Sequence, residues 1–132
     1  MNKEIELEIL TPYGKYYSGT VDQIKVHSED FYLGITPNHS PLITSLVISK
    51  MILIQNNEEK IYAISGGILD FKDGKAKMLL NSIESKEDID IDRALKAKQR
   101  AEERLLKSEQ VDINKAKIAL KRALNRIDIY HL

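Results

Sequence analysis

The chain of 132 residues contains no cysteine, which excludes disulfide frameworks, thiolate metal sites and cysteine nucleophiles. Its twenty basic and twenty acidic residues cancel, and zero net charge argues against a nucleic-acid-binding role for the molecule as a whole. No apolar run approaches the roughly 18 residues that a membrane-spanning helix needs, and the first ten residues are too acidic for a signal peptide. We therefore expect a soluble intracellular protein.

Proline and glycine are scarce, and their positions divide the chain into two parts. All three prolines and all six glycines precede residue 75, which predicts a β-rich part followed by a helical part. Residues 1–87 contain 9 Lys, no Arg and 12 acidic residues, a net charge of −3. Residues 88–132 contain 6 Lys, all 5 Arg and 8 acidic residues, a net charge of +3. We take residues 1–87 and 88–132 as two domains.

The first domain has the alternation of half-buried strands. Acidic and aliphatic residues alternate from Glu4 to Ile9. The segment Pro12-Tyr13-Gly14 predicts a turn, and Asn56-Asn57 and Asp73-Gly74 predict two more. The other predicted strands are a run containing Ile24 and Val26, followed by residues 41–46, 47–55, 60–65, 68–72 and 76–81. So many short strands predict an antiparallel β-sandwich or flattened barrel within an α+β protein.

The second domain is predicted to be an antiparallel two-helix hairpin. Asp90 or Asp92 can cap the first helix, and Asp112 can cap the second after a polar break at residues 108–110. Each helix carries a stripe of alanines, at residues 94, 97 and 101 and at residues 116, 119 and 123. Small side chains bury little apolar area, and each Å² of buried apolar area stabilises the packing by only about 25 cal/mol. We therefore expect a hairpin that opens at little energetic cost.

Residues that could carry catalysis are few. His27, His39 and His131 are scattered, and no two of them lie three or four residues apart as paired metal-ligating histidines on a helix do. Ser65-Gly66-Gly67 predicts a tight strand-to-strand turn and not a nucleophile elbow. The chain also lacks a glycine-rich phosphate loop that ends in Lys-Ser or Lys-Thr. Catalysis by this chain alone is not expected.

Two elements have a second, functional interpretation. The segment 34–42 is either a stiff strand connection or a docking loop for a partner. The five arginines form the other element: Arg93, Arg100 and Arg104 share one helix face, and Arg122 and Arg126 share another. If the helices pack antiparallel, four of the guanidinium groups converge, which gives either a solvated basic face or a polyphosphate site.

The order of these motifs is similar to the epsilon subunit of bacterial F-type ATP synthases. The matching motifs are Leu-Gly-Ile-Thr-Pro-Asn-His-Ser-Pro-Leu, Ile64-Ser65-Gly66-Gly67 and Ile-Asp-x-x-Arg-Ala, and the similarity covers essentially the whole chain. The resemblance implies a sandwich of about ten strands and a regulatory hairpin. It also implies a non-catalytic subunit of the central stalk, bound to the gamma subunit and the c-subunit ring and acting on the catalytic alpha and beta subunits. Such a subunit lies peripherally on the cytoplasmic side of the bacterial cell membrane.

In several bacterial members of this family, Ile-Asp-x-x-Arg-Ala marks a regulatory ATP site where nucleotide is sensed and not hydrolysed. The resemblance therefore implies that ATP, with or without Mg, binds here. The corresponding residues are Glu84, Ile89, Asp90, Arg93, Ala94, Arg100, Arg122 and Arg126. Partner contacts are implied for Tyr32, Pro37, Asn38 and His39 in the first domain and for Lys115, Lys117 and Lys121 in the second.

This sequence departs from the family pattern at three of those positions. Tyr32 stands where a glutamate often linked to the c ring is usual, Asn38 replaces a loop glycine, and Lys115 replaces an arginine of some ATP-binding members. Two other functions are left open by the sequence. One is a structural rotor subunit without a nucleotide site, and the other is a β-sandwich module whose basic hairpin binds RNA.

Overall fold

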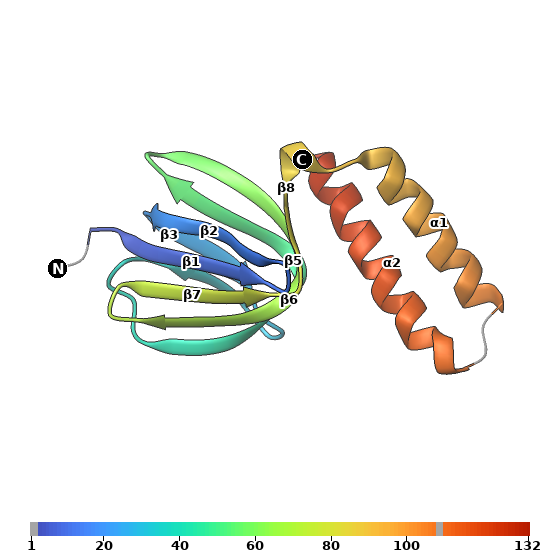
Figure 1. Cartoon of the computed structure of the whole chain (residues 1–132), viewed down its shortest axis with the longest axis horizontal. Coiled ribbons are helices and arrows are strands. Elements are labelled where there is room, and N and C mark those ends of the chain that lie inside the picture. The colour runs from blue at the N-terminus through green and yellow to red at the C-terminus, as the bar shows by residue number, and fades with distance from the viewer. Residues whose placement is uncertain (1–2, 108–109) are drawn as a thin grey trace. The chain divides into compact units, whose positions relative to one another are not determined.

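The computed structural model describes residues 3–107 and 110–132, with the side chains of residues 110–112 left out. The chain forms two compact units, Met1–Ser85 and Lys86–Leu132 (Figure 1). The second unit thus begins two residues before the composition boundary at residue 88. Within the described residues, no helix combines the length and apolar character needed to cross a membrane.

The first unit is a β-sandwich built from one folded sheet. In the described residues it has eight strands, joined in the order β2-β1-β7-β6-β5-β3-β4, with β8 paired to β6. Their bounds are β1 Ile5–Thr11, β2 Gly14–Val21, β3 Gln23–His27, β4 Tyr32–Ile35, β5 Leu42–Gln55, β6 Glu58–Lys72, β7 Lys75–Leu80 and β8 Ile83–Ser85. The predicted β-sandwich is confirmed, although one pair, β1 with β7, is parallel and not antiparallel.

The alternation of polar and aliphatic residues along the strands determines which side chains form the core. In β1, Ile5, Leu7 and Ile9 are buried and Glu6 is exposed. Buried aliphatic residues of β3, β5, β6 and β7 complete the core around Phe71 and Met78. The three predicted turns are also present. Asn56, Asn57, Asp73 and Gly74 have φ angles of 52°, 63°, 52° and 77°, as two-residue hairpin turns require.

The described residues form eight strands where the family resemblance implies about ten, and two pairs of the strands predicted from the residues are continuous. Residues 41–46 and 47–55 form β5, and residues 60–65 and 68–72 form β6. The predicted turn at Ser65-Gly66-Gly67 therefore lies inside β6. Leu46 pairs with Gly67 and Ile48 pairs with Ser65, so the register is the same on both sides of the glycines. Gly66 and Gly67, with φ angles of 99° and 155°, bend the strand without ending it.

The second unit contains a 3₁₀ turn, Lys86–Asp88, and two helices, α1 Ile91–Lys107 and α2 Gln110–Tyr130. Asp90 caps α1, because its Oδ1 accepts a hydrogen bond of 3.1 Å from the backbone N–H of Arg93. The prediction for Asp112 was wrong, since α2 begins at Gln110 and places Asp112 in its first turn. The rest of the predicted break, residues 108–109, lies outside the described residues.

Alanines form the contact between the two helices. Helices α1 and α2 lie side by side and run in opposite directions (Figure 1). Ala94 and Ala101 of α1 and Ala116 and Ala123 of α2 are at most 3% exposed. Two antiparallel helices with buried residues seven apart pack along one narrow seam, so the predicted small-residue contact is present.

Candidate functional site

Each of the four buried alanines of the hairpin directly follows a basic residue. The pairs are Arg93-Ala94, Arg100-Ala101, Lys115-Ala116 and Arg122-Ala123. Successive residues of an α-helix are about 100° apart around its axis, so each basic residue lies on the same side of its alanine. When two antiparallel helices face each other, residues that are rotated in the same direction away from the contact line lie on the same face of the pair. The four cations therefore lie on one face of the hairpin, which we call the basic face.

Two further arginines extend the basic face. Arg104 and Arg126 each follow a buried alanine, Ala101 or Ala123, by three residues. A step of three residues turns about 300° around the helix axis, which is equivalent to −60°. These two arginines therefore lie on the same side of the seam as the other cations. All five arginines thus share one face, and the sequence-predicted grouping of Arg93, Arg100, Arg122 and Arg126 follows from the helix geometry. Arg126 is half-buried, and the other four arginines are exposed.

Most of the described carboxylates of the two helices lie away from the basic face. Asp92, Glu102 and Asp128 lie about 100° or more from the arginines' side of the seam, whereas Glu103, three residues after Arg100, lies only about 60° from it. Within the described part of the chain, no carboxylate lies within 4.0 Å of the cationic nitrogens of Arg93, Arg100 or Arg122. Among the described residues, Arg93, Arg100 and Arg122 therefore carry positive charge that is not neutralised by a direct ion pair.

The Ile-Asp-x-x-Arg-Ala motif forms the start of α1, and its residues have different environments. Ile89 is 6% exposed and Ala94 belongs to the seam, so both serve packing. Asp90 uses one carboxylate oxygen as the helix cap, and Arg93 is exposed. Glu84 lies in β8 of the first unit, where it is half-buried and pairs in register with Ala63.

The three lysines assigned to partner contacts do not share one face. Lys115 lies on the basic face, whereas Lys117 follows Ala116 and lies on the opposite face. Lys121 is two residues before Ala123 and points outward from the hairpin. Leu95 and Leu124 lie on the same face as Lys117, at 47% and 38% exposure. The hairpin therefore has a basic face and an opposite face with exposed leucines.

The predicted docking loop is attached to the core of the sandwich. His39 is half-buried, and its ring lies edge-on to buried Phe71 with 6.0 Å between the ring centroids. The His39 backbone N–H donates to the carbonyl of Thr36 at 3.1 Å. Pro37 is half-buried and Asn38 is exposed. This geometry agrees with a stiff connection that presents Asn38, together with Thr36 and Ser40, to solvent.

An exposed aromatic cluster lies at the β3–β4 hairpin. Tyr32 is 50% exposed, and its ring centroid is 4.5 Å from that of His27. Phe31 beside it is 54% exposed, and sequence reasoning did not single it out. Partial burial, with a contribution from the positive charge of Lys50, lowers the pKa of His27 below its usual value.

Sequence reasoning also missed an apolar patch on the outer face of the sandwich. Ile43, Ile68 and Leu79 are 73%, 48% and 49% exposed, and Ile68 pairs in register with Leu79 across β6 and β7. The sequence signal that could have revealed this patch is an aliphatic residue at the solvent-facing position of each of three adjoining strands. Exposed apolar groups that cluster in this way mark interaction surfaces.

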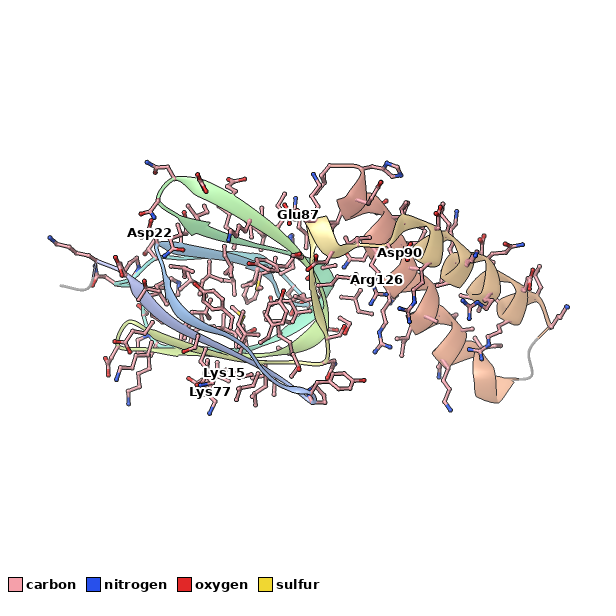
Figure 2. The ribbon with its side chains drawn as sticks, turned by 45° about the horizontal axis from the view of Figure 1, so that its top comes forward. Lys15, Asp22, Lys77, Glu87, Asp90 and Arg126 are labelled. Atoms are coloured by element: carbon pink, nitrogen blue, oxygen red, sulfur yellow. The ribbon has the colours of Figure 1, made fainter. Side chains whose placement is uncertain are left out.

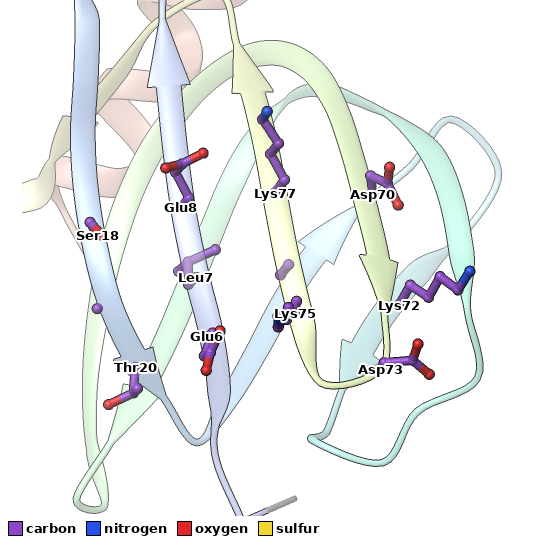
Figure 3. Close-up of a pocket in the computed structure, with 12 residues that line it drawn as sticks. Glu6, Leu7, Glu8, Ser18, Thr20, Asp70, Lys72, Asp73, Lys75 and Lys77 are labelled. Carbon is purple, nitrogen blue, oxygen red and sulfur yellow. The ribbon is translucent and has the colours of Figure 1, made fainter.

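A broad groove of about 920 Å³ runs over β2, β1, β7 and β6 (Figure 3). Acidic residues of β1 (Glu6 and Glu8) lie beside lysines of β7 (Lys75 and Lys77), because the parallel register pairs Glu6 with Lys75 and Glu8 with Lys77. None of the residues proposed from the sequence lines the groove. Its mixed charges do not define one ligand.

Comparison with known proteins identifies relatives along the whole chain. Residues 4–86 match the family model "ATP synthase, Delta/Epsilon chain, beta-sandwich domain", and residues 87–130 match the corresponding "long alpha-helix domain". The ATP synthase epsilon chain of Bacillus licheniformis is 40% identical over 96% of this chain and 98% of that relative. The ATP synthase epsilon chain of Desulforamulus reducens is 38% identical over 96% of this chain and 97% of that relative.

A solved structure has the same fold at low identity. A chain of the Euglena gracilis mitochondrial ATP synthase superimposes with a TM-score of 0.84 at 18% identity, covering 95% of this chain and 80% of that chain.

Proposed function

Because the chain belongs to the ATP synthase epsilon chain family, we propose that it is a non-catalytic subunit of the rotor that regulates ATP hydrolysis through its helical hairpin. It couples rotation of the central stalk to ATP synthesis while bound to the gamma subunit and the c ring. It lies peripherally on the cytoplasmic side of a bacterial membrane. Two exposed surfaces of the sandwich and one face of the hairpin support this proposal.

The sandwich supplies the stalk contacts. We assign the apolar patch of Ile43, Ile68 and Leu79 to the gamma subunit, since exposed aliphatic groups on a flat sheet favour a permanent protein partner. The aromatic cluster of Phe31 and Tyr32 is assigned to the c ring. A contact made through these rings depends on apolar burial and not on a carboxylate, and is therefore less sensitive to salt.

The hairpin binds ATP, and the observation that carries this proposal is that the alanine seam places Arg93 and Arg100 of α1 on the same face as Arg122 of α2. Guanidinium groups bind phosphate oxygens in a bidentate manner, so Arg93, Arg100, Arg122 and Arg126 neutralise the triphosphate, with or without Mg. Asp90 accepts a hydrogen bond from the adenine amino group or the ribose. Ile89 and Ala94 hold the first turn of α1 in place.

The closed hairpin and the ATP site form together, because the alanine seam brings cations of both helices onto one face. ATP at a hundred times its dissociation constant stabilises the closed form by about 2.7 kcal/mol. Without ATP the seam opens, and α2 extends along the gamma subunit. Lys115, Lys117 and Lys121 then meet acidic surfaces of the alpha and beta subunits and slow hydrolysis, while Leu95 and Leu124 supply apolar contact.

Calorimetric titration of the full chain with ATP tests the nucleotide site. Arg100→Gln removes one charge from the basic face and is expected to weaken ATP binding at least tenfold. The matched control is Lys98→Gln, which removes one charge from the opposite side of the seam on the same helix and should change affinity less than twofold. If both variants bind ATP as the parent does, or if the parent binds none, the chain is a structural rotor subunit without a nucleotide site.

A further inference from the structure

A small cavity lies in the sandwich at the tip of the β5–β6 hairpin, and none of the residues assigned to the gamma subunit or the c ring lines it. Its volume is about 130 Å³. The residues that line it are Tyr17 and Val21 of β2, Leu53 and Gln55 of β5, Asn56 of the turn, and Glu58, Lys60 and Tyr62 of β6. Val21 and Leu53 are 2% and 4% exposed and supply an apolar floor. Gln55, Glu58 and Lys60 are exposed and supply polar groups at the rim.

Two hydrogen bonds of Asp22 fix the frame of the cavity. The Asp22 backbone N–H donates to the carbonyl of Ile54 at 2.7 Å. The Asn56 backbone N–H donates to Asp22 Oδ2 at 2.9 Å. Figure 2 labels Asp22 near this hairpin tip. These bonds hold the end of β2 against the β5–β6 turn, so the cavity is preformed.

The two tyrosine rings are each held by a neighbour. Tyr62 is 7% exposed, and the ring of Tyr16 meets it edge-on with 6.4 Å between centroids. The Tyr17 ring lies over Gly19, because a Cβ added at Gly19 would be 3.0 Å from the Tyr17 hydroxyl oxygen. The Tyr17 hydroxyl also donates to the carbonyl of Thr20 at 3.4 Å. Both rings are therefore fixed walls, and they bring aromatic surface to the cavity.

The size of the cavity selects the size of its ligand. The cavity has about the volume that accommodates one benzene ring, and its lining combines polar and apolar groups, whereas pockets for drug-sized ligands measure about 300–1,000 Å³. We propose that this cavity binds a free small molecule with a single aromatic ring and one polar substituent. The ring packs between the tyrosines over Val21 and Leu53, and the substituent hydrogen-bonds to Glu58 or Lys60 at the rim.

Titration of the full ¹⁵N-labelled chain with p-cresol, followed by heteronuclear NMR, tests the proposal. We expect saturable shifts of the backbone amides of Leu53, Glu58 and Lys60. Tyr17→Leu removes one wall and is expected to weaken binding at least fivefold. Tyr13→Leu is the matched control, because Tyr13 is 95% exposed on the same β1–β2 hairpin and does not line the cavity; it should leave affinity unchanged.

A second variant, Val21→Met, fills the cavity from its floor and is expected to abolish the saturable shifts. Three results would overturn the proposal. The first is a set of shifts that never saturates, and the second is an equal effect of Tyr13→Leu and Tyr17→Leu. The third is shifts concentrated at Ile43, Ile68 and Leu79, which would show adsorption to the apolar patch. These outcomes are independent of ATP binding by the hairpin.

Discussion

Replacing Gly67 by alanine should destabilise the sandwich more than any other glycine-to-alanine change in its strands. An alanine Cβ at this position would lie 2.1 Å from the carbonyl oxygen of Leu79 and 2.8 Å from Cα of Leu80. Both atoms belong to the backbone of β7, which pairs with Gly67 in the sheet. No rotamer change relieves such a contact, so the paired strands must move apart by at least about 1 Å to restore ordinary packing.

The expected cost has two parts. Overpacking of a well-packed region costs about 1–3 kcal/mol. The φ angle of 155° adds strain of about 1–3 kcal/mol for a residue with a side chain. The sum, about 2–6 kcal/mol, is a large share of the roughly 5–15 kcal/mol that holds a domain folded. With a urea dependence of about 2 kcal/mol per M, the unfolding midpoint falls by about 1–3 M.

Urea unfolding followed by tyrosine fluorescence measures this effect, since five of the six tyrosines lie in the first unit. Gly34→Ala is the control, because Gly34 has no positive φ and its nearest neighbour would be the flexible end of Gln23 at 3.4 Å. We expect the control midpoint to shift by less than about 0.3 M. If the two variants unfold at the same urea concentration, the close approach of β6 and β7 at the bend is wrong.

Two further predictions concern the cap of α1 and the titration of His27. Asp90→Ala should lower hairpin stability by about 1 kcal/mol whereas Asp90→Asn keeps the cap, so circular dichroism melts should separate the two variants; equal melts would show that Asp90 Oδ1 does not cap the helix. The pKa of His27 is lowered in the folded state, so the unfolded state binds more protons and sandwich stability should fall as pH drops below about 6.5. Urea midpoints between pH 7.5 and 5.5 should show a smaller decrease for His27→Gln, and an identical decrease would remove His27 as its source.

The sequence was sufficient for the strands and turns because their signals are local. Alternating residues identify β1, and the turn residues Asn56-Asn57 and Asp73-Gly74 have the positive φ that a two-residue hairpin demands. The bend in β6 was mispredicted because a glycine pair has two uses. It can end a strand or allow another backbone to approach closely. Only the partner strand, here β7 at Gly67, decides between them.

The candidate site was predictable in part for the same reason. Helical periodicity groups the arginines on each helix, but the mutual orientation of two helices depends on which residues are buried between them. That information appears only with the burial of Ala94, Ala101, Ala116 and Ala123. The apolar patch and the Tyr17–Tyr62 cavity were missed because each unites residues from three or more distant segments.

A basic residue precedes each seam alanine in the sequence, so the packing of the two helices determines where these positive charges lie. Closing the seam buries Ala94, Ala101, Ala116 and Ala123 and at the same time brings cations of both helices onto one face. Two unit charges about 10 Å apart in water repel by roughly 0.4 kcal/mol, and physiological salt screens this repulsion further. Charge repulsion alone therefore does not force the hairpin open, and the shallow alanine seam alone does not hold it firmly shut. In that balance an anion that contacts both helices supplies the larger energy, because it binds the closed arrangement and has no such site in the open one.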